Sequence, residues 1–292
     1  MNKKRLRVLL FAVPYFAVLI FMHSCMTFRM SPKEVDTFFK SKNVTGSQHQ
    51  YKFRNYEMHY AQAGDETKPL VLFVHGSPGS LSAFIDFLAD TALLDNALLI
   101  TTDRPGFGHS HFGIAEPSLE KQAAALKPIL EKYSNNKPVI LVGHSLGGPV
   151  IAQMAMDYPE LVGGLVFVAA SIDPALEPDE LWFRAPLATP FLSWVLPRSF
   201  RASNEEIYQL EPQLENMMPR WKDVTCPVIF VQGMKDQLVD PGNAAFAKRM
   251  MTNTTVELVT KDDMNHFVPW SDPELIRNAI LTLLARREPV IK

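Results

Sequence analysis

The strongest constraint on the fold is a stretch of ten residues, 139–148, with the sequence VILVGHSLGG. Apolar residues typical of a buried strand run into Gly143-x-Ser145-x-Gly147, and a helical pattern follows at once. A serine at such a tight strand-to-helix turn needs small neighbours, which the two glycines provide. The turn would expose the Ser145 hydroxyl and leave the N–H of Leu146 at a helix N-terminus, where negative charge is stabilised. The context predicts a nucleophilic serine, although the motif alone also fits a glycine-rich linking turn.

Apolar runs and helical patterns alternate on both sides of this stretch. Short apolar runs predict buried strands at 70–74, 97–100, 139–142, 165–169, 227–231 and 255–259. Helical patterns lie between these runs, and a half-exposed hairpin is indicated at 51–61. The 292 residues, 47% hydrophobic, suit one large domain. The alternation predicts an α/β fold with a mostly parallel central sheet and helices on both faces.

The alternation stops between residues 172 and 222. This stretch has no buried strand run, and its prolines break it into short helical pieces. We predict a helical cap over the site, inserted into a core made of residues 51–171 and 223–288. Its large apolar residues would either line an acyl pocket or form the core of the cap, and packing is the commoner role. They are Trp182, Phe183, Phe191, Trp194, Met217, Met218 and Trp221.

The N-terminus has the pattern of an export signal. Basic residues in the first seven positions precede an apolar run at 8–22, which is short for a membrane span. His23-Ser24-Cys25 resembles a bacterial lipoprotein cleavage site, and the resemblance implies a lipid on Cys25. We therefore expect residues 1–24 to be a signal peptide or an uncleaved membrane anchor, with the lipoprotein preferred. Residues 25–50 would be a tether with a helix after Pro32, and the domain would be exported and anchored in a bacterial cell envelope.

Composition narrows the remaining classes of partner and cofactor. A net charge of −2 gives no basic surface for nucleic acid. The two cysteines cannot form a disulfide scaffold, and no Cys/His spacing, including His109 and His111, indicates a zinc site. Gly106 and Gly108 lack the third glycine and the helix of a dinucleotide-binding turn. In the same loop, we expect Asp103 and Arg104 to pair locally.

A nucleophilic serine requires a base and a carboxylate that orients it. The carboxyl ends of parallel strands meet at one edge of a sheet, so these partners should follow later strands. Asp236 and His266 follow the last two predicted strands, in the chain order Ser, Asp, His. Asp240 is the next candidate for the acid.

A second oxyanion donor is expected in the loop after the strand at 70–74. His75-Gly76-Ser77 ends that strand, and the small Gly76 would let the N–H of Ser77 point at a bound group. An ordinary strand-to-helix loop is the alternative.

These motifs together resemble the α/β-hydrolase superfamily, over about residues 50–288. They are His75-Gly76-Ser77-Pro78-Gly79, Asp103-Arg104-Pro105-Gly106-Phe107-Gly108, Gly143-His144-Ser145-Leu146-Gly147-Gly148, Gly233-Met234-Lys235-Asp236 and His266. The match looks most like the esterase and peroxidase-like branch with a helical cap. One departure is Asn265, where glycine often precedes the histidine.

The resemblance implies acyl transfer from a small-molecule ester, thioester or amide without a metal or organic cofactor. Ser145 would attack, His266 would act as base, Asp236 would hold the imidazole, and the N–H groups of Ser77 and Leu146 would bind the oxyanion. Dehalogenases and epoxide hydrolases of the superfamily carry aspartate at the nucleophile position, so Ser145 argues against those two chemistries. An aminopeptidase, a thioesterase, a carbon–carbon bond hydrolase, a perhydrolase and a non-catalytic small-molecule binding protein remain as alternatives.

Overall fold

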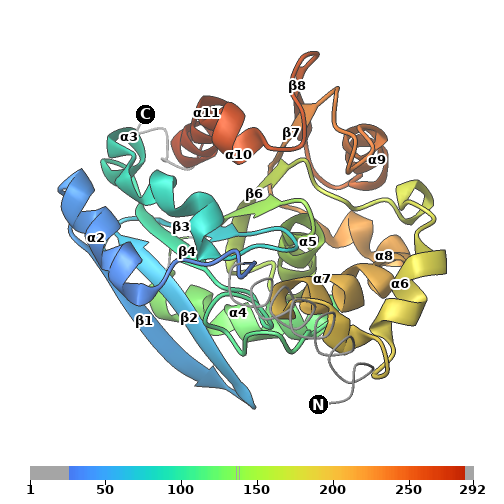
Figure 1. Ribbon diagram of the computed structural model, residues 1–292. Helices are drawn as coiled ribbons and strands as arrows, with labels where there is room; N and C mark the ends of the chain where they lie inside the picture. The colour runs from blue at the N-terminus through green and yellow to red at the C-terminus, as the bar shows by residue number, and fades with distance from the viewer. Residues whose placement is uncertain (1–25, 136, 138, 287–292) are drawn as a thin grey trace, which may run out of the picture.

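Eight strands form one sheet in the order β1-β2-β4-β3-β5-β6-β7-β8 (Figure 1). The computed structural model describes residues 26–135, 137 and 139–286. The hairpin of β1 and β2 joins β4 antiparallel, and every other neighbouring pair is parallel. The strands are β1 (Gly46–Phe53), β2 (Tyr56–Ala63), β3 (Leu70–Val74), β4 (Leu98–Thr102), β5 (Val139–His144), β6 (Val162–Val168), β7 (Val228–Gly233) and β8 (Val256–Lys261). The predicted α/β fold with a mostly parallel sheet is confirmed.

Helices cover both faces of this sheet, and two hydrophobic cores result. Successive residues of β3 alternate between the cores, because side chains of a strand point to opposite faces. Helices α4 (Leu119–Tyr133), α5 (Gly147–Asp157) and α9 (Gly242–Met250) pack on one face. The other face carries α2 (Pro32–Lys42), the 3-10 segment η1 (Leu81–Ala89), α3 (Thr91–Leu94) and α11 (Pro273–Ala285), with the short α10 (Val268–Ser271) before α11. All residues of β3, β4 and β5 are buried, as continuous apolar runs predict.

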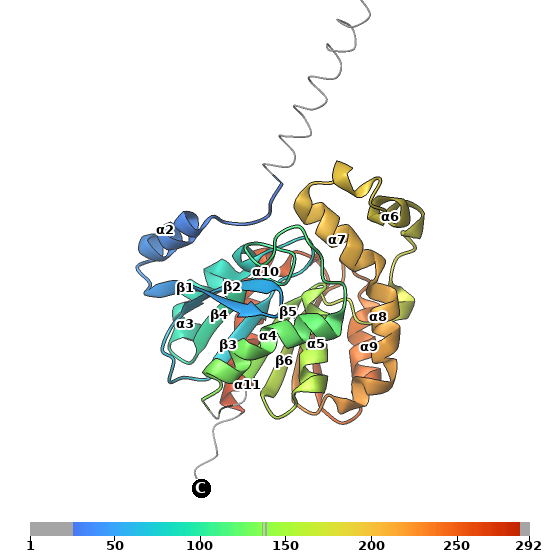
Figure 2. The ribbon, with the colours of Figure 1, turned by 90° about the horizontal axis from the view of Figure 1, so that it is seen from below.

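The connection between β6 and β7, which the structure describes in full, contains helices and no strand. It contains η2 (Pro174–Leu176), α6 (Leu181–Ala188), η3 (Ser193–Val195), α7 (Arg198–Tyr208), α8 (Leu210–Met217) and η4 (Met218–Asp223). Figure 2 shows α6 and α7 at one end of the molecule, while α8 lies along its side. Trp221 is buried against Phe246 of α9, so the last part of the connection packs on the core of the sheet.

The large apolar residues of this connection were expected to line a pocket or to form the core of the cap, but two aromatic residues among them do neither. Trp182 is 79% exposed and Phe191 is 82% exposed. No residue of α6 is buried, since this helix lies on the outside of α7 rather than between α7 and the sheet. The side chains of Trp182 and Phe191 therefore face outward.

The described part of the tether is an ordered segment of the domain. Helix α2 begins after Ser31, whose hydroxyl and the Glu34 carboxylate form a reciprocal cap, and Pro32 occupies its first turn. The sheet begins at Gly46, so the predicted tether at 25–50 reaches into the first strand. The predicted signal at 1–24 and Cys25 lie outside the described residues. None of the helices described between residues 26 and 286 has both the length and the apolarity to cross a membrane.

Candidate active site

Ser145 lies at a constrained turn between β5 and α5. Its φ of 52° is in the left-handed region, which non-glycine residues adopt rarely and mostly at functional turns. A Cβ at Gly143 would lie 2.5 Å from the carbonyl oxygen of Gly147, and one at Gly147 would lie 2.2 Å from that of Val74. Glycine is therefore required on both sides of the serine, as the sequence motif indicates. The turn places the side chain of Ser145 in a pocket at the edge of the sheet.

Asp236 and His266 meet at the carboxyl ends of β7 and β8. Nδ1 of His266 lies 2.8 Å from Oδ2 of Asp236, and the two side chains are 8% and 0% exposed. The other carboxylate oxygen accepts hydrogen bonds from the N–H groups of Leu238 and Val239, both at 2.9 Å. Burial alone would raise the pKa of Asp236, but the hydrogen bonds from His266 and the two N–H groups hold it below its ordinary 3.8. Asp236 is thus an ionised, fixed partner of the imidazole.

The structure separates Asp236 from the other acid candidate. Oδ1 of Asp240 accepts the N–H of Gly242 at 2.7 Å, and its backbone carbonyl accepts the Asn243 side chain. Asp240 therefore stabilises the start of α9, while Asp236 is the acid against His266.

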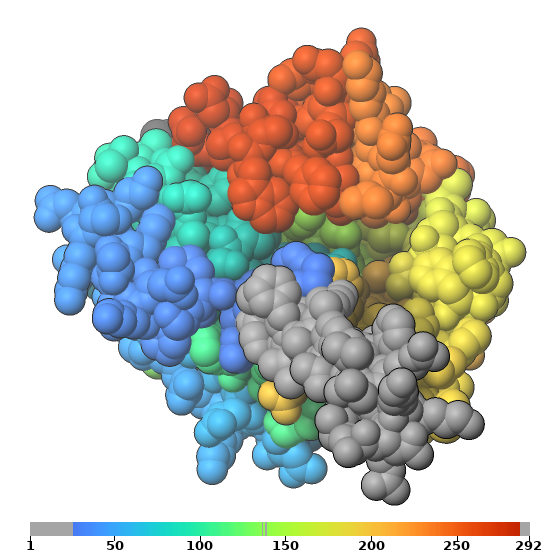
Figure 3. Space-filling model, in the orientation of Figure 1, coloured from blue at the N-terminus to red at the C-terminus, as the bar shows by residue number. Residues whose placement is uncertain are grey.

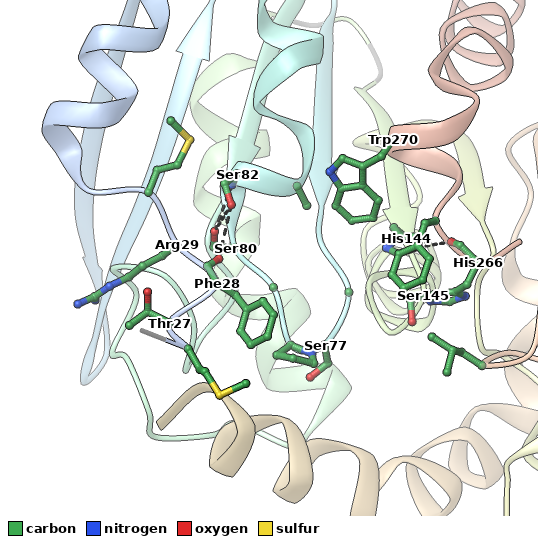
Figure 4. A pocket seen from close by; sticks show the side chains of 18 residues that line it. Thr27, Phe28, Arg29, Ser77, Ser80, Ser82, His144, Ser145, His266 and Trp270 are labelled. Atoms are coloured by element: carbon green, nitrogen blue, oxygen red, sulfur yellow. Dashed lines mark hydrogen bonds between the residues drawn. The ribbon is translucent and has the colours of Figure 1, made fainter. Parts of the chain in front are cut away.

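His144 supports His266 from behind, a role that sequence reasoning missed. Its Nε2–H donates to the backbone carbonyl of His266 at 3.0 Å, and the two ring centroids are 4.7 Å apart. Burial, with the charge of His266 second, lowers the pKa of His144 to about 3, so this ring stays neutral. Figure 4 shows Ser145, His266 and His144 at one end of the pocket, with Trp270 beside them. The position of His144 next to the serine gave no signal of this contact, which joins residues 122 positions apart.

The loop after β3 runs close beside Ser145. A Cβ at Gly76 would lie 2.9 Å from Cβ of Ser145, so the residue must be glycine for the two segments to approach. Ser77 follows and lines the pocket. Leu146 lies on the other side of Ser145, directly before α5. The two predicted oxyanion donors thus belong to the two backbone segments that adjoin the serine.

The expected local pair of Asp103 and Arg104 is wrong. Oδ2 of Asp103 contacts Nδ1 of His59 at 2.9 Å, whereas Arg104 pairs with Glu206 of α7 at 2.8 Å. Adjacent residues of an extended segment point to opposite faces, so the two charges diverge at the end of β4. Sequence reasoning also missed Glu206, because a partner about a hundred residues away leaves no local pattern.

Arg104 and Glu206 form a buried polar network next to the Gly76–Ser77 loop. Arg104 donates to the backbone carbonyls of His75 and Gly76 at 2.8 and 3.0 Å. Glu206 accepts from the Ser77 hydroxyl at 3.0 Å. Burial raises the pKa of Glu206, although Arg104 and the hydrogen bonds oppose that effect. The network therefore connects α7, a helix of the predicted cap, to the loop that adjoins Ser145.

The pocket has a volume of about 1080 Å³. Its lining includes Ser145, His266, the 76–80 loop and the apolar side chains of Leu238, Phe267 and Trp270. None of the described residues of 172–222 belongs to this lining, so the cap does not supply the acyl pocket that its aromatic residues suggested. Residues 26–30 form a wall of the pocket instead. Within the described parts of the chain, no cluster of three or more His, Cys, Asp or Glu residues could hold a metal.

Comparison with known proteins finds similarity to hydrolases over part of the chain. Residues 69–191 match the sequence model of the α/β hydrolase fold. Epoxide hydrolase 1 of Caenorhabditis elegans is 29% identical over 117 residues, which are 39% of this chain and 28% of that protein. A 2-hydroxy-6-oxononadienedioate/2-hydroxy-6-oxononatrienedioate hydrolase of Pseudomonas sp is 32% identical over 116 residues, 39% of this chain and 40% of that protein. The chain thus spans less than half the length of these relatives.

Solved structures agree over nearly the whole chain. A membrane phospholipase A, a novel bacterial virulence factor, superposes with a TM-score of 0.65 at 18% identity, covering 98% of this chain and 99% of that one. At this identity the likeness concerns the fold alone. The sheet order and this likeness show the fold of the α/β hydrolases, and residues 69–191 carry the matching sequence pattern.

Proposed function

We propose that this protein is a serine hydrolase that cleaves an ester, or a thioester or amide, through Ser145, His266 and Asp236. The observation that carries the proposal is the buried 2.8 Å contact of His266 with Asp236, at the wall of the pocket that Ser145 also lines. The ionised carboxylate can stabilise the imidazolium that forms when the serine loses its proton. Carboxylesterase-like chemistry is the member of this class that the apolar pocket suits best.

The roles of the residues follow from their positions. Nδ1 of His266 is held by Asp236, so Nε2 is the atom that takes the proton from Ser145 as its oxygen attacks the carbonyl carbon. The N–H groups of Ser77 and Leu146 would bind the oxyanion. His266 then protonates the leaving alcohol, thiol or amine, and water hydrolyses the acyl-enzyme by the same steps in reverse order.

Other activities of the superfamily fit less well. Epoxide opening by the superfamily route needs an aspartate nucleophile, and position 145 is serine. An aminopeptidase would need an acidic group for the substrate amine, and the described lining of the pocket contains no Asp or Glu. A carbon–carbon bond hydrolase and a non-catalytic binding protein remain alternatives. The second is disfavoured because serine, histidine and aspartate are all present and two of them are hydrogen-bonded.

Covalent labelling tests the proposal directly. A fluorophosphonate probe should label the folded protein and fail to label Ser145→Ala, which should also lose hydrolysis of a short-chain p-nitrophenyl ester. Ser41→Ala is the matched control, because Ser41 is exposed on α2 and does not line this pocket. Equal labelling and equal hydrolysis in Ser145→Ala and the parent would refute the proposal.

We also propose that the protein is exported and anchored in a bacterial cell envelope by a lipid on Cys25. The basic-then-apolar order of residues 1–22 and the Ser24-Cys25 pair support this. Metabolic labelling with a palmitate analogue should mark the protein and disappear in Cys25→Ala. Label that persists in this variant would contradict the lipid attachment and leave the uncleaved anchor.

A further inference from the structure

The first described residues, Met26–Met30, form a wall of the candidate active-site pocket, called here the N-terminal wall. The wall is fixed on two sides. The backbone carbonyl of Met26 accepts a hydrogen bond from Ser199 of α7, and Phe28 packs edge-on against Phe200 at 5.2 Å. On the side of the core, Arg29 reaches the loop after β4. The wall therefore bridges the cap and the core.

Two hydrogen bonds to the core hold the N-terminal wall on the side of the pocket opposite Ser145. Arg29 donates to the carbonyl of Gly108 at 2.8 Å, and Nε2 of His109 donates to that of Met30 at 3.0 Å. Figure 4 shows Phe28 at the side of the pocket opposite His266 and Trp270, with Ser77 between them. A ligand bound to Ser145 would thus extend toward Phe28. The volume of about 1080 Å³ is large for a small-molecule site and would hold a long acyl chain.

The wall is also the part of the described chain nearest to the proposed anchor. Cys25 directly precedes Met26, and the apolar run of the sequence ends at Met22. Because an extended residue spans at most about 3.6 Å, four residues reach no further than about 14 Å. Either form of the anchor would therefore hold the pocket close to the bilayer surface.

Exposed apolar side chains occur at the pocket and on the cap, at this same end of the molecule. Leu238, Phe267 and Trp270 line the pocket and are all more than half exposed. Trp182 on α6, Trp194 on η3 and Phe191 between these two elements are also exposed. Figure 2 shows the start of the described chain, α6 and α7 at one end, and Figure 3 shows the hollow bordered by the N-terminal, cap and C-terminal segments. Exposed aromatic groups around an apolar opening are typical of a membrane-contacting surface.

Two arginine side chains give this face positive charge, which also favours contact with a membrane surface. The guanidinium groups of Arg29 and Arg198 lie over the ring of Phe112, 4.3 and 5.7 Å from its centre. Arg29 belongs to the wall and Arg198 precedes Ser199, which binds the wall, so anionic lipid headgroups at this face would meet both charges.

We propose that this face rests on the bilayer and that the substrate is an acyl ester lipid whose chain enters the pocket from the bilayer along the N-terminal wall. The inference rests on the proposed serine hydrolase and on the proposed anchor. In the reaction, the ester C–O bond breaks, His266 returns the proton of Ser145 to the leaving lipid alcohol, and water supplies the second oxygen of the released fatty acid. The cap then serves as a membrane contact and not as the acyl pocket.

Tryptophan fluorescence tests the contact without reference to activity. The full-length protein is reconstituted in phosphatidylcholine vesicles, with and without bromine on the acyl chains. We expect the brominated lipid to quench the emission, and Trp182→Phe/Trp194→Phe to lose at least half of that quenching. Trp221→Phe is the control, because Trp221 is fully buried and should contribute none of it. Absence of quenching in the parent would overturn the membrane contact of this face, and equal fractional quenching in the parent and the double variant would overturn the contact of the cap.

The substrate class is tested by a ratio of activities. The kcat/KM for a long-chain phospholipid in vesicles is divided by that for a short soluble acyl ester. We expect Phe28→Ala to lower this ratio at least tenfold, and Ile114→Ser, which removes an exposed apolar side chain outside the pocket lining, to leave it within twofold. Cleavage of the soluble ester with no cleavage of phospholipid would refute this inference alone, whereas failure on both would refute the hydrolase.

Discussion

The ion pair of Arg104 and Glu206 joins the cap to the backbone beside Ser145, and its removal offers a quantitative test. Arg104 is fully buried and Glu206 is 1% exposed. Glu206→Leu would leave the guanidinium without its carboxylate and the Ser77 hydroxyl without its acceptor. Removing one partner of a buried pair costs about 3–5 kcal/mol, because the remaining charge stays desolvated.

That loss is measurable by thermal and urea unfolding. For a domain of this size, 1 kcal/mol shifts Tm by about 2–4 °C, so a decrease of about 6–20 °C is expected. Glu205→Leu is the matched control, since the same substitution at this half-buried neighbour should change stability by only about 0.5 kcal/mol. Because the Gly76–Ser77 loop loses its support, kcat for an acyl ester should also fall, by roughly tenfold or more.

The raised pKa of Glu206 predicts the outcome of a double substitution. Burial disfavours the charged form of Glu206 more than the attraction of Arg104 favours it, and the pKa is therefore raised. The ion pair itself then adds little net stability to the fold. Arg104→Met/Glu206→Leu should therefore recover at least half of the loss seen in Glu206→Leu. A single-variant loss below about 1 kcal/mol, or losses that simply add in the double variant, would contradict this account of the network.

Three further predictions concern the turn and its histidines. Asp236→Asn should lower kcat by about 10⁴ through the wrong imidazole tautomer, while Asp240→Asn should leave kcat within a few-fold; similar kcat values in both would reassign the acid. The pKa of His144 falls from 6.5 in the unfolded chain to about 3, so the unfolded chain takes up the proton first. The contribution of neutral His144 to the free energy of unfolding is complete above pH 6.5 and is lost as pH falls toward 3, by up to about 5 kcal/mol. In urea unfolding, His144→Gln should therefore make the free energy of unfolding less dependent on pH between 6.5 and 3. An unchanged pH dependence in this variant would exclude His144 as its source. Gly147→Ala should prevent correct assembly of the turn, because its Cβ would lie 2.2 Å from the Val74 carbonyl, and a soluble variant with parental fluorophosphonate labelling would refute this.

Local pattern predicted the sheet well, because buried strands read as continuous apolar runs. Residues that follow parallel strands meet at one edge, and the structure brings Asp236 and His266 into contact there, while Ser145 and His266 line the same pocket. Their catalytic roles stay a prediction until they are tested.

Contacts between distant segments could not be predicted in this way. Arg104 meets Glu206 and His144 meets His266 only because the folded chain brings them together, and neither pair has a sequence spacing that signals contact. The outward orientation of Trp182 depends on α6 lying outside α7, which helical periodicity does not specify. The same holds for Met26–Met30, whose place in the pocket depends on the Ser199 and His109 side chains that bind their carbonyls.

That mode of attachment has a consequence for the evolution of substrate preference. Ser199, Ser82 and His109 all bind main-chain oxygens, those of Met26, Phe28 and Met30, and backbone carbonyls are the same whatever side chain they carry. The side chains at 26 and 30 can therefore change in size while the segment keeps its place, whereas a change at 28 also alters the packing on Phe200. Under the proposed function, a few substitutions close to the proposed membrane tether would be enough to alter the length of acyl chain accepted, with Ser145, Asp236 and His266 left untouched.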